Sequence, residues 1–210
     1  MISLFHQCVF VHIPKCAGQS VETAFLNELN LTWKQRAVLQ LRPKTVSDPK
    51  EAPPKLAHLM AKQYVSLGYL PDHLFDQFLK FSVIRNPWAR VYSIYKYKTK
   101  QKIPFNDYVI NVFEKELFKK LYWFAAPQVD YLSDDDNKIL VDNIVRLENS
   151  QEIESLFKSL GFSSTTLPHV NESKSKSEAS KRYQDVYCEK SYEVVKRLYR
   201  RDIEVFDYSF

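Results

Sequence analysis

The sequence predicts an α/β fold with three layers, in which a mostly parallel central sheet is flanked by helices. Two short apolar runs rich in β-branched residues, at 8–13 and 81–84, each lead directly into a helical pattern. Strands that alternate with helices are joined by crossover connections, and such connections favour parallel pairing. The 210 residues, 45% of them hydrophobic, are enough for one core, so we expect a single domain over residues 1–210.

Three helices are predicted in the first half of the chain. Apolar residues recur at helical spacing after the first strand and again after the segment 41–54. Prolines interrupt that segment, which is predicted to be a loop, either a flap over substrate or a surface excursion. Asn86 is a good N-cap and Pro87 a good first residue for the helix after the second strand. The predicted helices span residues 20–29, 56–67 and 87–98.

The second half of the chain is predicted to mix helices with short strands. Its acidic turn lacks the spacing of a calcium-binding loop. The helix that begins at Ser150 has the clearest apolar period, and Gly161 ends it. The predicted elements are a helical segment at 105–123, the acidic turn at 133–137, strands at 139–141 and 144–147, a helix at 150–160, a polar stretch at 163–182 and a last helix around 194–199.

The turn after the first strand has the composition of an anion-binding loop. The first N–H groups of a helix have no partner within the helix, and the helix dipole favours negative charge there. Lys15 adds a full charge, Gly18 allows close approach of the backbone, and Ser20 supplies a hydroxyl. His12 is interpreted as packing at the end of the strand. The order of lysine and glycine differs from that of a nucleotide-triphosphatase P-loop, so we predict a phosphate or sulfate ester as the ligand.

A second anion-binding segment follows the second strand. Arg85 leaves that strand just before the next helix, and Ser93 lies about two turns along the helix. These two side chains could hold one phosphate, whereas Arg90 is interpreted as structural. Because ligands of parallel sheets bind at the carboxyl ends of the strands, the two segments predict one ligand with two separated anionic groups.

Composition excludes several other classes of protein. The net charge of +5 is mild and comes with no arginine-rich tract or zinc-finger spacing, so no nucleic-acid partner is expected. The three cysteines show no paired motif, which argues against a disulfide-stapled domain. Cys16 is interpreted as a small residue that fills the loop, with a lowered thiol pKa as the alternative. No apolar run is long enough for a membrane segment.

These motifs together resemble those of the sulfotransferase family. Residues 14–20 (PKCAGQS) are similar to its 5′-phosphosulfate loop, and residues 85–90 (RNPWAR) with Ser93 to its 3′-phosphate motif. Residues 168–173 and the C-terminal Tyr199, Asp202, Phe206 and Tyr208 resemble the closing motifs of the carbohydrate branch, which includes heparan 2-O- and chondroitin-type enzymes. The resemblance implies a P-loop-like fold and 3′-phosphoadenosine 5′-phosphosulfate (PAPS) as the sulfuryl donor.

Sulfuryl transfer assigns roles to particular residues. Negative charge develops on the oxygen that leaves with the phosphate, and Lys15, pinned between Pro14 and Gly18, is predicted to stabilise it. His58 stands where the resemblance places the family's base, and Glu22 is the alternative because another branch uses a glutamate on this helix. The transferred group carries less charge than a phosphoryl group, so no metal is expected. The predicted donor-binding residues are Lys15, Ala17, Gly18, Gln19, Ser20, Val21, Arg85, Ser93, Asn171 and Lys174.

The acceptor is the least constrained part of the prediction. The branch resemblance suggests a hydroxyl on a glycan, and the sequence gives no expectation for the oligomeric state. Without a leader or anchor, the chain resembles a cytoplasmic bacterial-type enzyme, or the catalytic domain of a Golgi enzyme cut from its anchor. A non-catalytic nucleotide or polyanion-binding module and a phosphoryl-transfer enzyme remain as alternatives, the latter with Asp142 as its candidate carboxylate.

Overall fold

The computed structural model describes residues 1–39, 58–168 and 182–210, and it has an α/β architecture built on a four-stranded sheet. The strands are β1 (Ile2–Ser3), β2 (Cys8–Val11), β3 (Leu79–Ile84) and β4 (Asn143–Arg146), in the spatial order β1-β2-β3-β4. β2 pairs with β3 and β3 with β4 in parallel, whereas β1 pairs with β2 antiparallel. The sheet is therefore mixed, with two parallel strand pairs and one antiparallel pair. The two residues of β1 are too few to show a sequence period.

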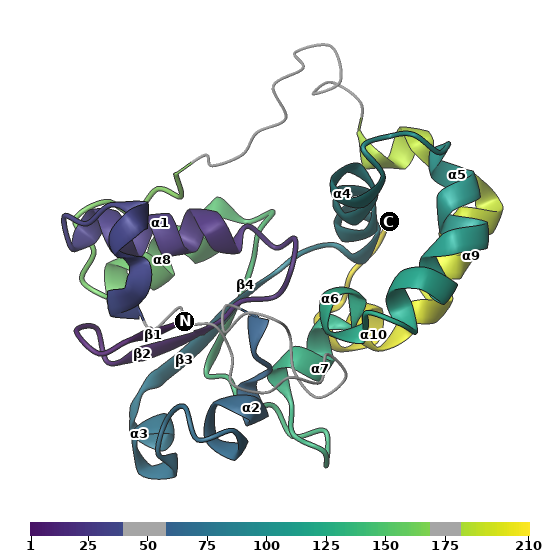
Figure 1. Ribbon diagram of the computed structural model, residues 1–210. Helices are drawn as coiled ribbons and strands as arrows, with labels where there is room; N and C mark the ends of the chain where they lie inside the picture. Colours follow the sequence, from purple (N-terminus) through teal and green to yellow (C-terminus); the bar gives the residue numbers. More distant parts are fainter. Residues whose placement is uncertain (40–57, 169–181) are drawn as a thin grey trace.

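Helices cover both faces of the sheet, as predicted (Figure 1). On one face lie α1 (Gly18–Glu28) and α8 (Ser150–Ser159), and on the other lie α2 (Ala61–Ser66), α3 (Asp72–Gln77) and α7 (Gln128–Leu132). Successive residues of a strand point to opposite faces. Phe10 accordingly stacks with Phe81 beneath α1, at 5.1 Å between ring centroids, while Val9 and Val11 pack against the opposite helices.

A third group of helices lies beyond the carboxyl ends of the parallel strands (Figure 1). Trp88, at the start of α4, packs there with Phe113 and Tyr199 in a separate aromatic core. The helix predicted at 105–123 is interrupted, because most of it is a π-helix followed by a break before α6. The group comprises α4 (Pro87–Thr99), α5 (Phe105–Asp107), η3 (Tyr108–Phe118), α6 (Tyr122–Ala125), η4 (Tyr183–Val186), α9 (Glu189–Leu198) and α10 (Arg200–Phe206).

Local signals predicted several element ends correctly. The Asn86 side chain accepts hydrogen bonds from the Trp88 and Ala89 N–H groups, so it caps α4. Gly161 has a φ of +77°, the left-handed conformation that ends α8. Helix α10, which was not predicted, has a largely charged sequence and buries only Asp202 and Phe206.

Two predicted elements are shorter than expected. Of the strand predicted at 139–141, only Ile139 forms an isolated bridge, with Ser133. The helix predicted at 56–67 begins at Ala61, and the 3-10 helix η1 (Trp33–Leu39) precedes the segment 40–57, which lies outside the described residues.

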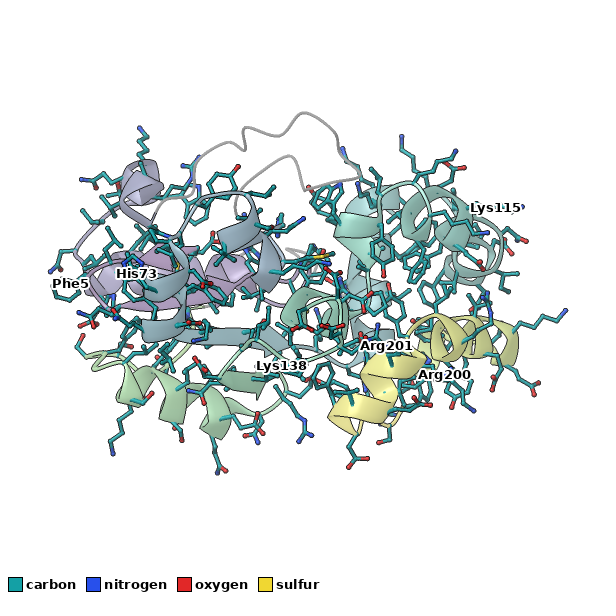
Figure 2. All side chains as sticks on the ribbon, turned by 90° about the horizontal axis from the view of Figure 1, so that it is seen from below. Phe5, His73, Lys115, Lys138, Arg200 and Arg201 are labelled. Carbon is teal, nitrogen blue, oxygen red and sulfur yellow. The ribbon has the colours of Figure 1, made fainter. Side chains whose placement is uncertain are left out.

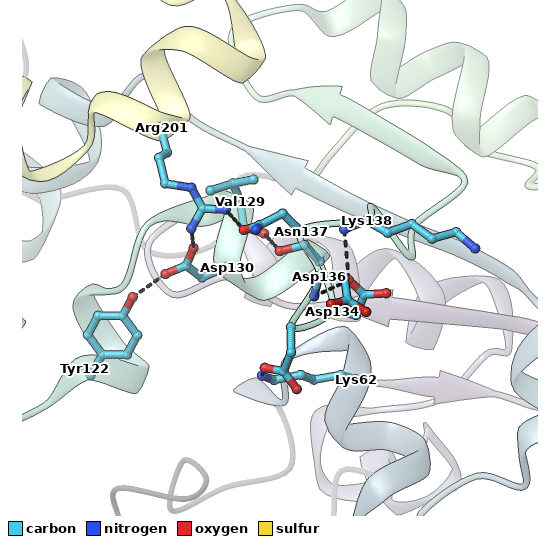
Figure 3. A network of polar contacts seen from close by, with 11 residues as sticks. Lys62, Tyr122, Val129, Asp130, Asp134, Asp136, Asn137, Lys138 and Arg201 are labelled. Carbon is cyan, nitrogen blue, oxygen red and sulfur yellow. Dashed lines mark hydrogen bonds and ion pairs between the residues drawn. The ribbon is translucent and has the colours of Figure 1, made fainter.

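The acidic turn at 133–137 is confirmed as a turn whose carboxylates bond nearby groups (Figure 3). The Asp134 Oδ1 accepts from the N–H groups of Asp136 and Lys138, at 3.0 and 2.8 Å. Asp135 pairs with Lys62. Arg201 then ties α10 to this region by donating to Asp130 and Asn137, each at 2.5 Å. Asp130, Asp134 and Asp135 therefore bond neighbouring groups of the fold.

Charged side chains otherwise surround the outside of the molecule (Figure 2). Lys115 points outward from the π-helix, as Arg200 does from α10. Within the ranges 1–39, 58–168 and 182–210, no helix combines the length and apolarity needed to cross a membrane.

Candidate active site

The loop between β2 and α1 has an unusual backbone. Lys15 and Ala17 have φ angles of +70° and +56°, in the left-handed region that non-glycine residues seldom adopt. This alternation turns the chain sharply at the end of β2 and starts α1 at Gly18. Successive N–H groups in such a turn, together with a helix N-terminus, form a concave anion-binding surface. The sequence predicted the surface but not the two strained residues that shape it.

Gly18 has a packing role that the sequence did not predict. Its φ is not positive, and its Cα lies directly against the ring of His12. A Cβ at this position would lie 1.9 Å from the His12 Nε2 and Cδ2 atoms. The buried imidazole beneath the loop therefore requires a residue without a Cβ at this position.

Arg85 is held at the end of β3 by a side chain that the sequence did not indicate. Gln128 bonds both backbone groups of Arg85: its Oε1 accepts from the N–H at 2.8 Å, and its Nε2 donates to the carbonyl at 2.7 Å. Arg85 in turn donates from Nη1 to the Lys15 carbonyl at 3.3 Å. These bonds join the two predicted anion-binding segments directly.

Both segments line one hollow of about 1060 Å³. Its charged lining residues are Lys15, Arg85, Lys96 and Glu154, so positive charge predominates. Burial lowers the pKa of Lys15, and the neighbouring Arg85 lowers it further because two cations repel. Of the predicted residues, the hollow brings together Lys15, Ala17, Gln19, Ser20, Arg85 and Ser93.

Other predicted residues lie elsewhere. Val21 is fully buried among the residues under α1, and its N–H donates to the Ala17 carbonyl at 3.2 Å, so neither its side chain nor its amide reaches the hollow. Gly18 is buried at the start of α1 and does not line the hollow. Asn171 and Lys174 lie outside the described residues.

His58 does not line the hollow but connects to it through rings. It stacks with Trp123 at 5.8 Å between centroids, Trp123 contacts Phe124, and Phe124 stacks with Tyr97 at 5.9 Å. The Lys15 Nζ lies over the Tyr97 ring, 4.3 Å from its centroid. His58 and Lys15 therefore lie at the two ends of a continuous row of aromatic side chains formed by Trp123, Phe124 and Tyr97.

The two candidate bases have different environments. Glu22 is 2% exposed, and its Oε1 lies 2.9 Å from the His12 Nδ1. His58 is half-buried, and its Nδ1 lies 3.2 Å from the His12 carbonyl oxygen. Because a carbonyl only accepts, the Nδ1 of His58 carries the hydrogen, and in the neutral ring Nε2 is the basic nitrogen.

Arg90 is structural, as interpreted from the sequence. It is 0% exposed and donates to the carbonyls of Pro14, Ala126 and Phe124 at 3.0, 2.7 and 3.3 Å. Two of the C-terminal motif residues support the same segment: Tyr199 donates to the Ala125 carbonyl at 2.6 Å, and Asp202 accepts from the first N–H groups of α7. This motif therefore fixes the framework behind the anion loop.

The burial of Asp202 predicts a pH-dependent stability. Burial raises the pKa of Asp202 from its ordinary 3.8 to about 6, although the N–H groups of Gln128 and Val129 oppose this shift. The folded state holds the proton more tightly, so this contribution to stability is complete below about pH 4 and is lost as pH rises through about 6. Asp202→Asn serves as the reference because its side chain does not titrate. We expect the difference in unfolding free energy, wild type minus Asp202→Asn, to fall by about 3 kcal/mol as pH rises from about 4 to above about 6. Urea unfolding at several pH values measures it, and a difference that is flat or rises with pH would contradict it.

Cys16 is not a reactive thiol. Burial raises its pKa to about 12, and the charges of Arg90 and Arg85 lower it too little to compensate. Its Sγ lies 3.2 Å from the Gln128 Oε1. The interpretation of Cys16 as a residue that fills the loop is therefore the correct one.

The site also contains residues that sequence reasoning did not assign. Lys96 and Tyr97 in the lining, and Gln128 behind Arg85, were not among the predicted site residues. Their roles depend on contacts across the fold, such as Gln128 with Arg85, and no local pattern in the sequence encodes such contacts. Further lining residues come from α8 and the segment before the undescribed residues: Leu147, Ser150, Ile153, Glu154, Thr165, Thr166, Leu167 and Pro168.

The fold and site define an α/β protein with a cationic hollow at the carboxyl ends of its parallel strands. A family model described as the sulfotransferase family matches residues 1–209, so the chain belongs to the sulfotransferase family. Family membership supports transfer of a sulfuryl group to an acceptor as its general activity. No protein of curated function and no solved structure matches the chain significantly.

Proposed function

We propose that this protein transfers the sulfuryl group of PAPS to an acceptor hydroxyl. The observation that carries the proposal is the shared hollow, where Lys15 and Ser20 from one anion-binding segment meet Arg85 and Ser93 from the other. PAPS has two anionic groups, a 5′-phosphosulfate and a 3′-phosphate, on one adenosine. Two anion-binding segments that line one hollow suit such a ligand. The same strand–loop–helix unit is the basis for proposing a P-loop-like fold.

Lys15 has the role of stabilising the leaving group. In the transfer, the acceptor oxygen bonds to sulfur, the bond from sulfur to the bridging oxygen breaks, and that oxygen leaves with the 5′-phosphate. A cation near the bridging oxygen stabilises the transition state, in which this charge develops, more than it stabilises the ground state. The loop and Ser20 hold the 5′-phosphate, and Arg85 with Ser93 holds the 3′-phosphate.

His58 is the base in this proposal. The acceptor hydroxyl loses its proton to the Nε2 of His58, the nitrogen that its hydrogen bond to the His12 carbonyl leaves basic. Glu22 is less suited because it is 2% exposed and bonds His12, whereas His58 is only half-buried. Asn171 and Lys174 remain proposed donor contacts on the strength of the motif alone.

We propose a glycan as the acceptor. The support is the carbohydrate-branch motifs, together with Tyr92 and Tyr97 in the lining, because aromatic rings pack against the apolar faces of sugars. Transfer of labelled sulfate from PAPS to a panel of glycans, with steroid and phenol acceptors for comparison, tests this choice.

The phosphoryl-transfer alternative loses its candidate carboxylate. Asp142 lies before β4, at the amino ends of the parallel strands and thus at the edge opposite to Arg85. It pairs there with Lys80, at 3.1 Å from the Nζ, and accepts from the Lys80 N–H at 2.8 Å. This carboxylate is structural.

We expect 3′,5′-bisphosphoadenosine to raise the melting temperature, and AMP or ADP to raise it much less. At a hundredfold excess over its dissociation constant, a ligand adds about 2.7 kcal/mol, which corresponds to about 5–10 °C for a chain of this size. AMP and ADP lack the 3′-phosphate that Arg85 and Ser93 would bind. Thermal denaturation measures the shifts. Equal shifts from all three nucleotides would contradict the donor assignment, and a selective shift without sulfate transfer to any acceptor would favour a non-catalytic binding module.

A further inference from the structure

His12 is buried where three segments of the site meet. It follows β2 and is 5% exposed. The Nε2 end of its ring lies against Gly18 in the anion loop, and its Nδ1 lies 2.9 Å from the Oε1 of Glu22 on α1. The rings of His12 and His58 meet edge to face, with centroids 4.4 Å apart and planes at 63°. One imidazole therefore contacts the loop, the helix and the proposed base.

Glu22 fixes the orientation of this imidazole. A buried carboxylate is costly unless it accepts hydrogen bonds, and the Nδ1 of His12 supplies one. A carboxylate only accepts, so the Nδ1 of His12 donates, and this bond determines which way the ring is turned. The ring can then lie against Gly18 only because that residue has no Cβ. Position, rotation and tautomer of His12 are all specified by its neighbours.

His12 in turn holds His58 in position through two contacts. Its carbonyl accepts from the His58 Nδ1 at 3.2 Å, and its ring closes one side of the His58 ring. The first contact selects the tautomer with a basic Nε2, and the second limits rotation of the ring. Orientation of this kind matters because misplacing a reacting group by about 1 Å can cost about 100-fold in rate.

We propose that His12, oriented by Glu22, is a positioning residue that aligns the base His58 with the loop carrying Lys15. This inference rests on the proposed function, since it takes His58 as the base. Glu22 then acts on the reaction only through His12, and neither residue touches the donor or the acceptor. In many enzymes a carboxylate orients the catalytic histidine directly. Here the carboxylate of Glu22 would orient His58 indirectly, through His12.

The test compares kcat with donor affinity in variants of the pair. Glu22→Ala and His12→Asn are expected to lower kcat by about 10- to 100-fold. The donor KM and the melting shift produced by 3′,5′-bisphosphoadenosine should remain as in wild type. Glu22→Gln should restore most of kcat, because its amide oxygen can still accept from the His12 Nδ1. Should Glu22→Ala not fold, Glu22→Asp carries the same prediction, because its shorter side chain withdraws the carboxylate.

A matched control separates positioning from general stability. Asp142→Asn weakens another pair that includes a buried partner, at the opposite edge of the sheet, and should lower stability without changing kcat. An unchanged kcat in Glu22→Ala, a rise in donor KM alone, or an equal loss of kcat in Asp142→Asn would overturn the positioning role.

The two proposals fail in distinguishable ways. If His58→Ala keeps its turnover, the base assignment fails and the positioning role fails with it, while the nucleotide-induced melting shift still tests the donor site. If His58→Ala loses turnover but Glu22→Ala and His12→Asn do not, only the positioning role fails.

Discussion

Replacing Lys15 by methionine is expected to lower kcat by about 100- to 1000-fold. Removing one group that stabilises charge developing in a transition state has effects of this size. Methionine keeps much of the length and apolar stem of lysine. It is also unbranched at Cβ, so residue 15 should keep its left-handed φ and the loop its shape. Part of the nucleotide affinity should remain, since Arg85 and Ser93 are unchanged. Turnover at saturating PAPS, measured with labelled sulfate, gives the effect on kcat.

The control for this experiment is Lys115→Met, which removes the same charge from an exposed position on the π-helix (Figure 2); no residue of this helix lines the hollow. It should leave kcat and nucleotide binding unchanged. A Lys15→Met enzyme that keeps its kcat and shows only a raised donor KM would mean that Lys15 binds the donor without stabilising the leaving oxygen.

The location of the site could be predicted from the sequence because its signals are local. A strand that runs into a lysine-containing turn and a helix specifies an anion-binding loop within about ten residues, and the same holds for Arg85 and Ser93. Parallel pairing of β2 with β3 then brings both strand ends to one edge of the sheet. Residue type and order were sufficient for this part.

What the sequence could not predict depends on tertiary contacts. Gly18 was predicted to allow close approach of the backbone to a ligand, but its contact with the His12 ring could not be predicted, because no pattern places that ring beneath the loop. Gln128 fixes Arg85 from 43 residues away, and Asp202 caps α7 from 74 residues away. Val21 was included among donor contacts by its place in the motif, whereas helical geometry turns it into the core.

The two arginines of the segment 85–90 are expected to behave in opposite ways. Arg90→Met should lower the unfolding free energy by about 3 kcal/mol or more, because it leaves three carbonyls buried without their donor. Arg85→Met should change stability by about 1 kcal/mol or less, because Arg85 is half-buried and its guanidinium makes one long bond to the Lys15 carbonyl.

For nucleotide binding, we expect Arg85→Met to have the larger effect and Arg90→Met the smaller one. Arg85→Met should abolish the melting shift produced by 3′,5′-bisphosphoadenosine, whereas Arg90→Met, where it remains folded, should keep it. Urea unfolding and thermal denaturation of the two variants give both quantities. The opposite result, in which a folded Arg90→Met protein loses the nucleotide response and Arg85→Met keeps it, would contradict the assignment. Arg90 rather than Arg85 would then bind the 3′-phosphate. The comparison separates a framework residue from a ligand contact within one short motif, because the guanidinium of Arg90 bonds buried carbonyls and Arg85 lines the hollow.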